Sequence, residues 1–148
     1  MKKQFFLLVF AAALIMGCSS TPKFTSVTKK DWKLVKAEIN GREILLNRKT
    51  LASENAGNNF TLKFDGGSIN GIGTANTCTA SYTLGNSQKI TVQSVRPTSI
   101  PTRQPEKIWE QKYFLYLGNT YEWTVVNKNL KLSSKTEDGD EVNLEFSL

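Results

Sequence analysis

Residues 60–84, FTLKFDGGSINGIGTANTCTASYTL, contain the pattern from which the fold of this chain can be worked out. Phe60, Leu62 and Phe64 alternate with polar residues, which predicts a strand with one apolar face. Asp65–Gly67 follows, and glycine reaches the positive φ of a tight hairpin turn without steric cost. The stretch therefore predicts a β-hairpin at the centre of the fold.

Two glycines stand in the returning part of this stretch, at Gly71 and Gly73. Glycine weakens an ordinary strand, so this spacing predicts a bulge, a corner or a close backbone crossing. The pair does not predict a phosphate-binding loop, because no third glycine opens a helix after it and no Gly-Lys-Thr follows.

The residues before this hairpin predict another one. Residues 32–39 form a first strand with a change of inward face near Val35. Asn40-Gly41 is a strong hairpin signal, because a type I′ turn needs positive φ at both central residues. Residues 43–46 return as the second strand. The polar residues 47–59 predict a surface loop, long enough to be either functional or simply mobile.

The second half of the chain adds strands and one helix. Residues 96–105 hold three prolines and predict a rigid crossing segment that leads into a helix over residues 105–117, ending at Gly118. Further strands are predicted over residues 89–95, 121–126, 130–134 and 142–148. The fold class is therefore mainly β (α+β): a small antiparallel barrel, cracked open, or a strongly curved sheet, of about eight strands with one helix.

The predicted helix is apolar around much of its circumference. Trp109, Tyr113 and Tyr116 share one arc, and Ile108 and Leu115 share another. This exceeds a single amphipathic stripe. Two interpretations stay open: the helix packs into the open mouth of a barrel, or the three aromatic residues remain exposed as a partner-binding surface.

The N-terminus has the order of a bacterial export signal. Lys2 and Lys3 precede an apolar run too short to span a bilayer, and Gly17-Cys18 follows it. We interpret residues 1–17 as a signal peptide, residues 18–30 as a lipidated Cys18 with a flexible tether, and residues 31–148 as one domain. A plain secretory signal that happens to contain a cysteine is the alternative.

Lipidation at Cys18 would supply several acyl chains, and two or more chains anchor a protein stably to a membrane. Cys18 lies in Ile15–Cys18, a stretch similar to a bacterial lipobox, with Leu14 one position earlier than usual. Ser19 is not the aspartate that retains many enterobacterial lipoproteins at the inner membrane. By this resemblance the protein belongs to the cell envelope, anchored at the outer membrane on its periplasmic or surface face.

Composition excludes several classes of function. The chain has 19 basic and 13 acidic residues; loss of Lys2 and Lys3 with the leader leaves 17 against 13, a net charge of +4. These charges are scattered, which does not predict a nucleic-acid surface, although weak attraction to anionic lipid or glycan remains open. Cys78 is predicted to point into the core as a small hydrophobe; a reactive or intermolecular thiol is the alternative.

The residue types do not favour catalysis. The chain has no histidine, which removes Ser-His and Cys-His mechanisms and most zinc sites. The four acidic residues within 137–141 lack calcium-loop spacing and predict a charged hairpin tip. Gly139 lies between them. We expect no enzyme activity, no cofactor, no metal and no catalytic residue.

Taken together, the motifs resemble the META domain, the family of the bacterial heat-shock protein HslJ, over residues 31–148. The residues that match are Gly71, Gly73, Asn76, Tyr82, Thr98, Glu110, Phe114, Leu115 and Leu117. Ala75, and Pro101 or Thr102, stand where relatives carry a cysteine pair, so the resemblance implies that the family disulfide is absent here.

The resemblance also implies a function. META domains are similar in shape to secretin pilot lipoproteins, cracked barrels that bind lipid or a partner peptide, and this similarity is at the level of fold. We therefore expect a non-enzymatic envelope protein that binds a protein or lipid partner in envelope homeostasis or stress response. Two alternatives are a lipocalin-like carrier of a small apolar ligand and an inhibitor of an envelope hydrolase.

Overall fold

The computed structural model of the chain describes residues 22–44, 60–101 and 106–148, and the side chains of residues 106–108 are not described. The signal peptide, Cys18, the predicted loop over residues 47–59 and part of the proline-rich crossing segment lie outside these residues. The predictions made for them therefore stay predictions.

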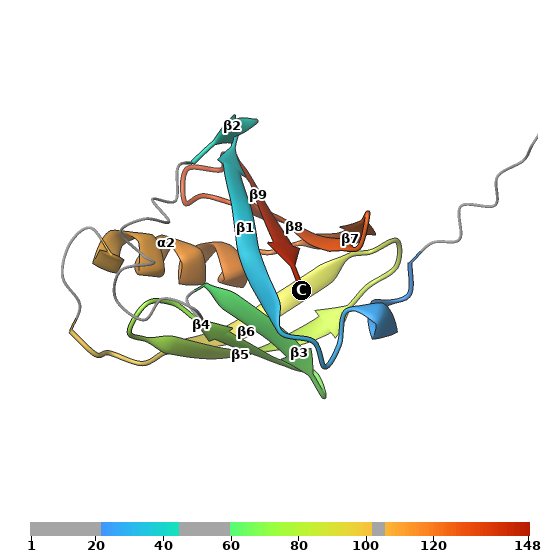
Figure 1. Cartoon of the computed structure of the whole chain (residues 1–148), viewed down its shortest axis with the longest axis horizontal. Coiled ribbons are helices and arrows are strands. Elements are labelled where there is room, and N and C mark those ends of the chain that lie inside the picture. Colours follow the sequence, from blue (N-terminus) through green and yellow to red (C-terminus); the bar gives the residue numbers. More distant parts are fainter. Residues whose placement is uncertain (1–21, 45–59, 102–105) are drawn as a thin grey trace, which may run out of the picture.

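The described residues form one antiparallel sheet with one α-helix (Figure 1). The strand order is β6-β5-β4-β3-β1-β9-β8-β7, and the short β2 pairs with β1. The strands are β1 (Trp32–Ile39), β2 (Arg42–Glu43), β3 (Thr61–Asp65), β4 (Ser68–Ile72), β5 (Thr77–Leu84), β6 (Ile90–Pro97), β7 (Glu122–Val126), β8 (Asn129–Lys135) and β9 (Glu141–Ser147), and the helix is α2 (Glu106–Gly118). The predicted fold class is confirmed.

The sheet curls until its two outer strands meet at one end. The N–H of Ile90 donates to the carbonyl of Tyr121 at 3.1 Å, and the N–H of Trp123 donates to that of Gln88 at 3.0 Å. Farther along, α2 packs against both β6 and β8, where the sheet is split (Figure 1). The molecule is thus a cracked barrel whose gap is filled by the helix.

Local backbone geometry follows the sequence at the predicted turns. Asn40 and Gly41 have φ of 49° and 75°, and Gly66 and Gly67 have 55° and 84°, as tight hairpin turns of this type require. The register between β1 and β9 shifts between Leu34 and Lys36. This bulge confirms the predicted change of inward face near Val35, because the extra residue reverses the alternation.

The interior of the barrel is filled with large side chains. Trp32, Phe64 and Phe146 from three different strands are almost fully buried, and aliphatic side chains of β8 and β9 pack among them. From α2, Tyr113 and Tyr116 are 3% and 4% exposed. The interpretation in which the helix packs into the open mouth of the barrel therefore holds for Tyr113 and Tyr116, and these two residues are not an exposed surface.

The segment before β1 packs on the domain instead of hanging free. Phe24–Ser26 forms a 3-10 turn (η1), and Val27 is 0% exposed. The carbonyl of Val27 accepts a 2.8 Å hydrogen bond from the indole Nε1 of Trp32. The predicted start of the domain at residue 31 is therefore preceded by residues that already pack on the sheet. Phe24 and Val27 supply the apolar surface that docks this end of the predicted tether.

Replacement of Phe24 by alanine tests this docking. The ring contacts Phe64 and Trp123, so Phe24→Ala should lower the free energy of unfolding by about 1–3 kcal/mol, less than for a fully buried ring. Urea denaturation followed by tryptophan fluorescence measures the loss. Thr25→Ala, at an exposed neighbouring position, serves as the control, and equal stability of the two variants would contradict the docked arrangement.

Candidate functional site

Glu110 of α2 is a buried carboxylate, 3% exposed, that holds the turn between β4 and β5. Its Oε2 accepts hydrogen bonds from the backbone N–H groups of Thr74 at 2.6 Å, Ala75 at 2.9 Å and Asn76 at 2.8 Å. The Thr74 hydroxyl donates to the same oxygen at 3.0 Å. A buried charge with this many donors is stabilised, so the helix is fixed to the turn.

Asn76 extends this network to the crossing segment after β6. Its Nδ2 donates to Oε1 of Glu110 at 2.7 Å and to the carbonyl of Ile100 at 2.9 Å. Its Oδ1 accepts from the Ile100 N–H at 2.6 Å and from the Thr98 hydroxyl at 2.8 Å. One amide side chain thus joins the β4–β5 turn, α2 and the segment at residues 98–100.

The two glycines of β4 and its turn are explained by the same approach of the helix. A Cβ on Gly73 would lie 2.5 Å from Cγ and Oε2 of Glu110, and one on Gly71 would lie 2.9 Å from Sγ of Cys78 and 3.1 Å from Cδ1 of Leu117. Side chains at these positions would push α2 away. The predicted close backbone crossing is not what is observed: the close neighbours are side chains, those of Cys78 and Leu117 at Gly71 and that of Glu110 at Gly73.

The surroundings of Glu110 act on its pKa in opposite directions. Burial raises the pKa of the carboxyl, and hydrogen bonds from Asn76 and Thr74 lower it; the net pKa lies below the ordinary value of 4.5. Because the folded pKa is depressed, this group stabilises the fold fully above its unfolded pKa. The contribution is lost as the pH falls through the folded pKa.

Glu110→Gln should therefore destabilise the protein by about 2–4 kcal/mol at neutral pH, because the amide puts a donor where Asn76 also donates. The variant should also lose part of the acid-range pH dependence of unfolding. Denaturation at a series of pH values measures both effects. Glu43→Gln, at an exposed strand position, is the control; a Glu110→Gln protein with unchanged stability and pH slope would contradict the anchoring role.

An open groove lies beside this network, between α2 and the chain that runs from the end of β6 to Pro101. Its volume is about 740 Å³, within the range of ligand and peptide sites. Apolar lining comes from Val95, Pro97, Ile100, Phe114 and Leu115. We call this the α2 groove.

The aromatic residues predicted for partner binding lie elsewhere on the helix. Tyr113 is buried and donates its hydroxyl to the carbonyl of Thr61 at 2.9 Å, Tyr116 is buried, and Trp109 is half-buried. They line a void of only about 10 Å³ toward β1 and β9. Sequence reasoning missed the α2 groove, although the proline-rich segment next to a widely apolar helix was a signal for it.

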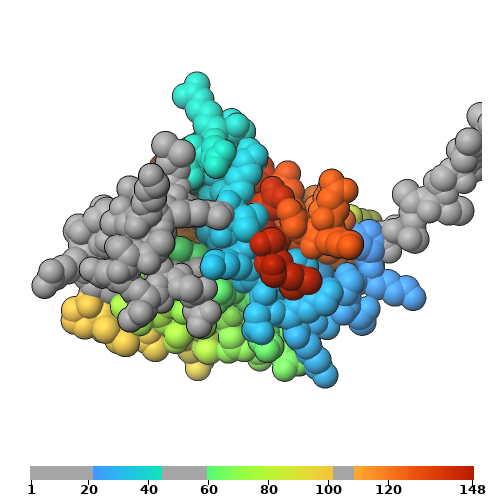
Figure 2. All heavy atoms as spheres, in the orientation of Figure 1, coloured from blue at the N-terminus to red at the C-terminus, as the bar shows by residue number. Residues whose placement is uncertain are grey.

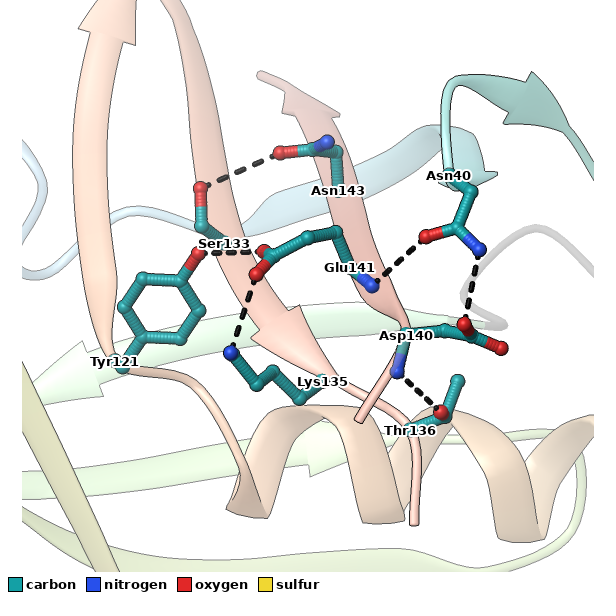
Figure 3. Close-up of polar contacts among 8 residues, drawn as sticks. All are labelled: Asn40, Tyr121, Ser133, Lys135, Thr136, Asp140, Glu141 and Asn143. Carbon is teal, nitrogen blue, oxygen red and sulfur yellow. Dashed lines mark hydrogen bonds and ion pairs between the residues drawn. The ribbon is translucent and has the colours of Figure 1, made fainter. Parts of the chain in front are cut away.

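The acidic residues of the β8–β9 turn form part of a polar network on the surface (Figure 3). Glu141 accepts from the Tyr121 hydroxyl at 2.6 Å and lies 3.3 Å from Nζ of Lys135. Asp140 accepts from Nδ2 of Asn40 at 2.9 Å, which joins this turn to the β1–β2 hairpin. Two carboxylates of the predicted hairpin tip thus have protein partners, as expected for a structural tip.

Titration of the tyrosines tests this network. The hydrogen bond to Glu141 raises the pKa of Tyr121 to about 12, because ionisation would place two negative charges together. Glu141→Gln should lower the pKa of this tyrosine, as followed by absorbance of the phenolate. Tyr121→Phe should remove the same transition and so assign it; an unchanged titration in Glu141→Gln would contradict the contact.

Of the remaining residues singled out in the sequence, Cys78 is in the core and Tyr82 packs against the core. Cys78 is 2% exposed, and burial raises the pKa of its thiol to about 11, which confirms the core position. Tyr82 is half-buried against Phe24 and Phe64. In the described part of the chain, no group of three or more His, Cys, Asp or Glu side chains could hold a metal ion, and no helix has the length and apolar character to cross a membrane.

Comparison with protein families identifies this arrangement. The model of the META domain matches residues 25–145. The chain belongs to the META domain family. No curated protein matches the chain. The match starts inside the docked segment, which agrees with the packing of Phe24 and Val27 on the META domain.

Solved structures show the same fold as this META domain. One is an NMR structure of a protein from Burkholderia xenovorans, with a TM-score of 0.60 and 15% identity over 99% of each chain. Another is the crystal structure of a duf4847 family protein from Bacteroides vulgatus, with a TM-score of 0.55 and 12% identity over 84% of this chain and 95% of that one. Similarity at this level of identity concerns the fold alone.

Several of the residues that carried the resemblance to the META domain lie close together in space, and one of them lies far from the others. Gly73, Asn76, Thr98 and Glu110 come together in one hydrogen-bonded or closely packed cluster, which we call the Glu110 network. Tyr82 lies apart, among aromatic rings at the docked N-terminal segment. The motif therefore maintains the shape of the META domain, and the α2 groove is the open surface that this shape produces.

Proposed function

We propose that this protein is a non-catalytic, lipid-anchored META-domain protein of the bacterial envelope, and that it binds an extended apolar segment of a protein partner in the α2 groove. The role is in envelope homeostasis or stress response, similar to that of a secretin pilot at the level of fold. The anchor is the lipid on Cys18, and the outer membrane is the compartment that Ser19 favours.

The observation that carries the binding role is the chemistry of the α2 groove. Ile100 is 56% exposed although its backbone N–H and C=O are both held by Asn76. An apolar side chain presented to solvent by a fixed backbone is typical of a contact surface, because no ordering is needed when a partner binds.

The polar groups of the groove favour a neutral segment. Both oxygens of the Glu110 carboxylate already accept hydrogen bonds from the β4–β5 turn, so this group is held away from a ligand by its partners in the protein. Gln111, Ser99 and Asn119 supply uncharged amide and hydroxyl groups along the lining. Such groups pair with the backbone of an extended peptide, while the apolar lining receives its side chains.

The filled interior argues against the lipocalin-like carrier. Such a carrier needs a cavity inside the barrel, whereas here Trp32, Phe64 and Phe146 occupy the centre. The void beside Trp109 has about 10 Å³, the space of a single water molecule. A ligand of this META domain is therefore better placed in the α2 groove than within the barrel.

Site-specific photo-crosslinking in cells tests the groove. A photoreactive amino acid at Leu115 or Ile100 should give a discrete protein adduct, while one at Leu84 should not. Leu84 is a matched control, because it is 48% exposed and is not part of the groove lining. Equal adducts at Leu84 and at the groove positions would overturn the assignment, and an adduct with lipid instead of protein would replace the proposed partner.

Charge substitution gives the complementary test. Ile100→Asp should reduce capture of the crosslinked partner by about tenfold or more, since a carboxylate would be desolvated against the apolar lining. Leu84→Asp should leave capture unchanged. Full capture by Ile100→Asp would contradict the proposal. The mass of the membrane-extracted protein separately tests the acylation of Cys18.

A further inference from the structure

The docked segment at residues 22–30 lies at one end of the barrel. The ring of Phe24 packs against Phe64, Tyr82 and Trp123 at centroid distances of 5.2, 5.3 and 4.8 Å. The N–H of Lys29 donates to the carbonyl of Phe64 at 2.8 Å. The chain is therefore pinned to the sheet shortly after the position proposed to carry the lipid.

This end and the α2 groove lie at opposite ends of the molecule. In Figure 1 η1 lies on the right, whereas the start of α2 and the residues after β6 lie on the left. The space-filling view in the same orientation shows the residues near η1 exposed on the right-hand side (Figure 2). The two regions therefore lie apart along the horizontal direction of both views.

The chain between the lipid and the pinned residues is short. Cys18 precedes Phe24 by six positions, and six residues span at most about 20 Å when fully extended. A folded domain of this length is roughly 35 Å across. While Phe24 and Val27 stay docked, the chain therefore cannot stand with its groove end against the bilayer and its pinned end about 35 Å away.

The surface at the pinned end suits an anionic lipid surface. Lys23, Lys29 and Lys30 are exposed there. Residues 22–30 contain no acidic residue, and Asp31, which follows them, lies 3.3 Å from Nζ of Lys63. The three lysines give the docked segment a net positive charge, and lipid phosphates within a Debye length would attract it.

We propose that residues 22–30 form the membrane-facing surface of the domain, holding the pinned end of the barrel against anionic lipid and turning the α2 groove away from the bilayer. This inference rests on the proposed lipid anchor at Cys18. The docking of Phe24 and Val27 has a role in this arrangement. A docked segment limits the orientation of the domain relative to the bilayer, whereas a free segment would leave that orientation open. The partner then reaches the groove from the aqueous side.

Fluorescence quenching on vesicles tests the orientation. The full chain is expressed in bacteria, its mass is measured to detect the lipid on Cys18, and it is reconstituted into phosphatidylcholine vesicles with or without phosphatidylglycerol. Single cysteines at Thr25→Cys or Ser99→Cys carry a fluorophore, because an acylated Cys18 has no thiol and Cys78 is buried. Headgroup-linked nitroxide lipid should quench position 25 more strongly than position 99, and more so with phosphatidylglycerol.

Two variants separate the causes of this asymmetry. On pure phosphatidylcholine vesicles, a Gly/Ser insertion of about fifteen residues after Ser20, which reaches roughly 50 Å, should abolish the asymmetry without touching the packed domain. Charge reversal at Lys23, Lys29 and Lys30 should remove the effect of phosphatidylglycerol and leave the protein on the vesicles. Equal quenching at both positions in the unaltered chain would overturn the proposed orientation.

Failure of the anchor is distinguishable from failure of the orientation. A mass without acyl groups would contradict the proposed function, and a Cys18→Ser chain carrying an N-terminal histidine tag, bound to nickel-chelating lipid, would then supply the anchor for the same measurement. Cys78 would not take up the fluorophore, because its thiol is buried with a pKa of about 11. With either anchor, stronger quenching at position 25 than at position 99 supports the proposed orientation, and equal quenching at the two positions overturns it.

Discussion

A buried carboxylate is the constraint on which the rest of this structure depends. Glu110 would be costly to bury alone, and it is stabilised because one turn directs three N–H groups and a hydroxyl at a single oxygen. Those donors exist only if the chain bends sharply after β4. Position 73 must then lack a side chain, because a Cβ would occupy the space of the carboxylate. Helix position, turn shape and residue choice are thus set together.

The α2 groove is a consequence of this constraint. The side chain of Asn76 is hydrogen-bonded both to Glu110 and to the backbone of Ile100. These bonds hold the segment after β6 near the helix without packing it against the helix. Apolar side chains on both sides remain accessible between them. The side chain of Asn76 thus joins the β4–β5 turn to residues 98–100 through hydrogen bonds.

The two ends of the barrel have different roles in the proposed function. At one end an aromatic cluster receives Phe24 and fixes the incoming chain. At the other, a helix fills the split in the sheet and leaves an open groove. Because the segment between Cys18 and the barrel is short and the barrel is rigid, attachment to a membrane would also set the direction in which the α2 groove faces. Rigidity is needed for this, and the packed interior supplies it.

The sequence by itself determined what depends on neighbouring residues: the turns at Asn40-Gly41 and Asp65–Gly67, the change of inward face near Val35 and the strand at residues 142–148. These follow from φ preferences and from period-two patterning, which are local. Only the tertiary structure decided that Glu110 meets residues more than thirty positions away, that Tyr113 and Tyr116 face inward, and that Phe24 docks. A helix apolar on nearly all sides does not reveal which arc will be buried, because that choice is made by long-range packing.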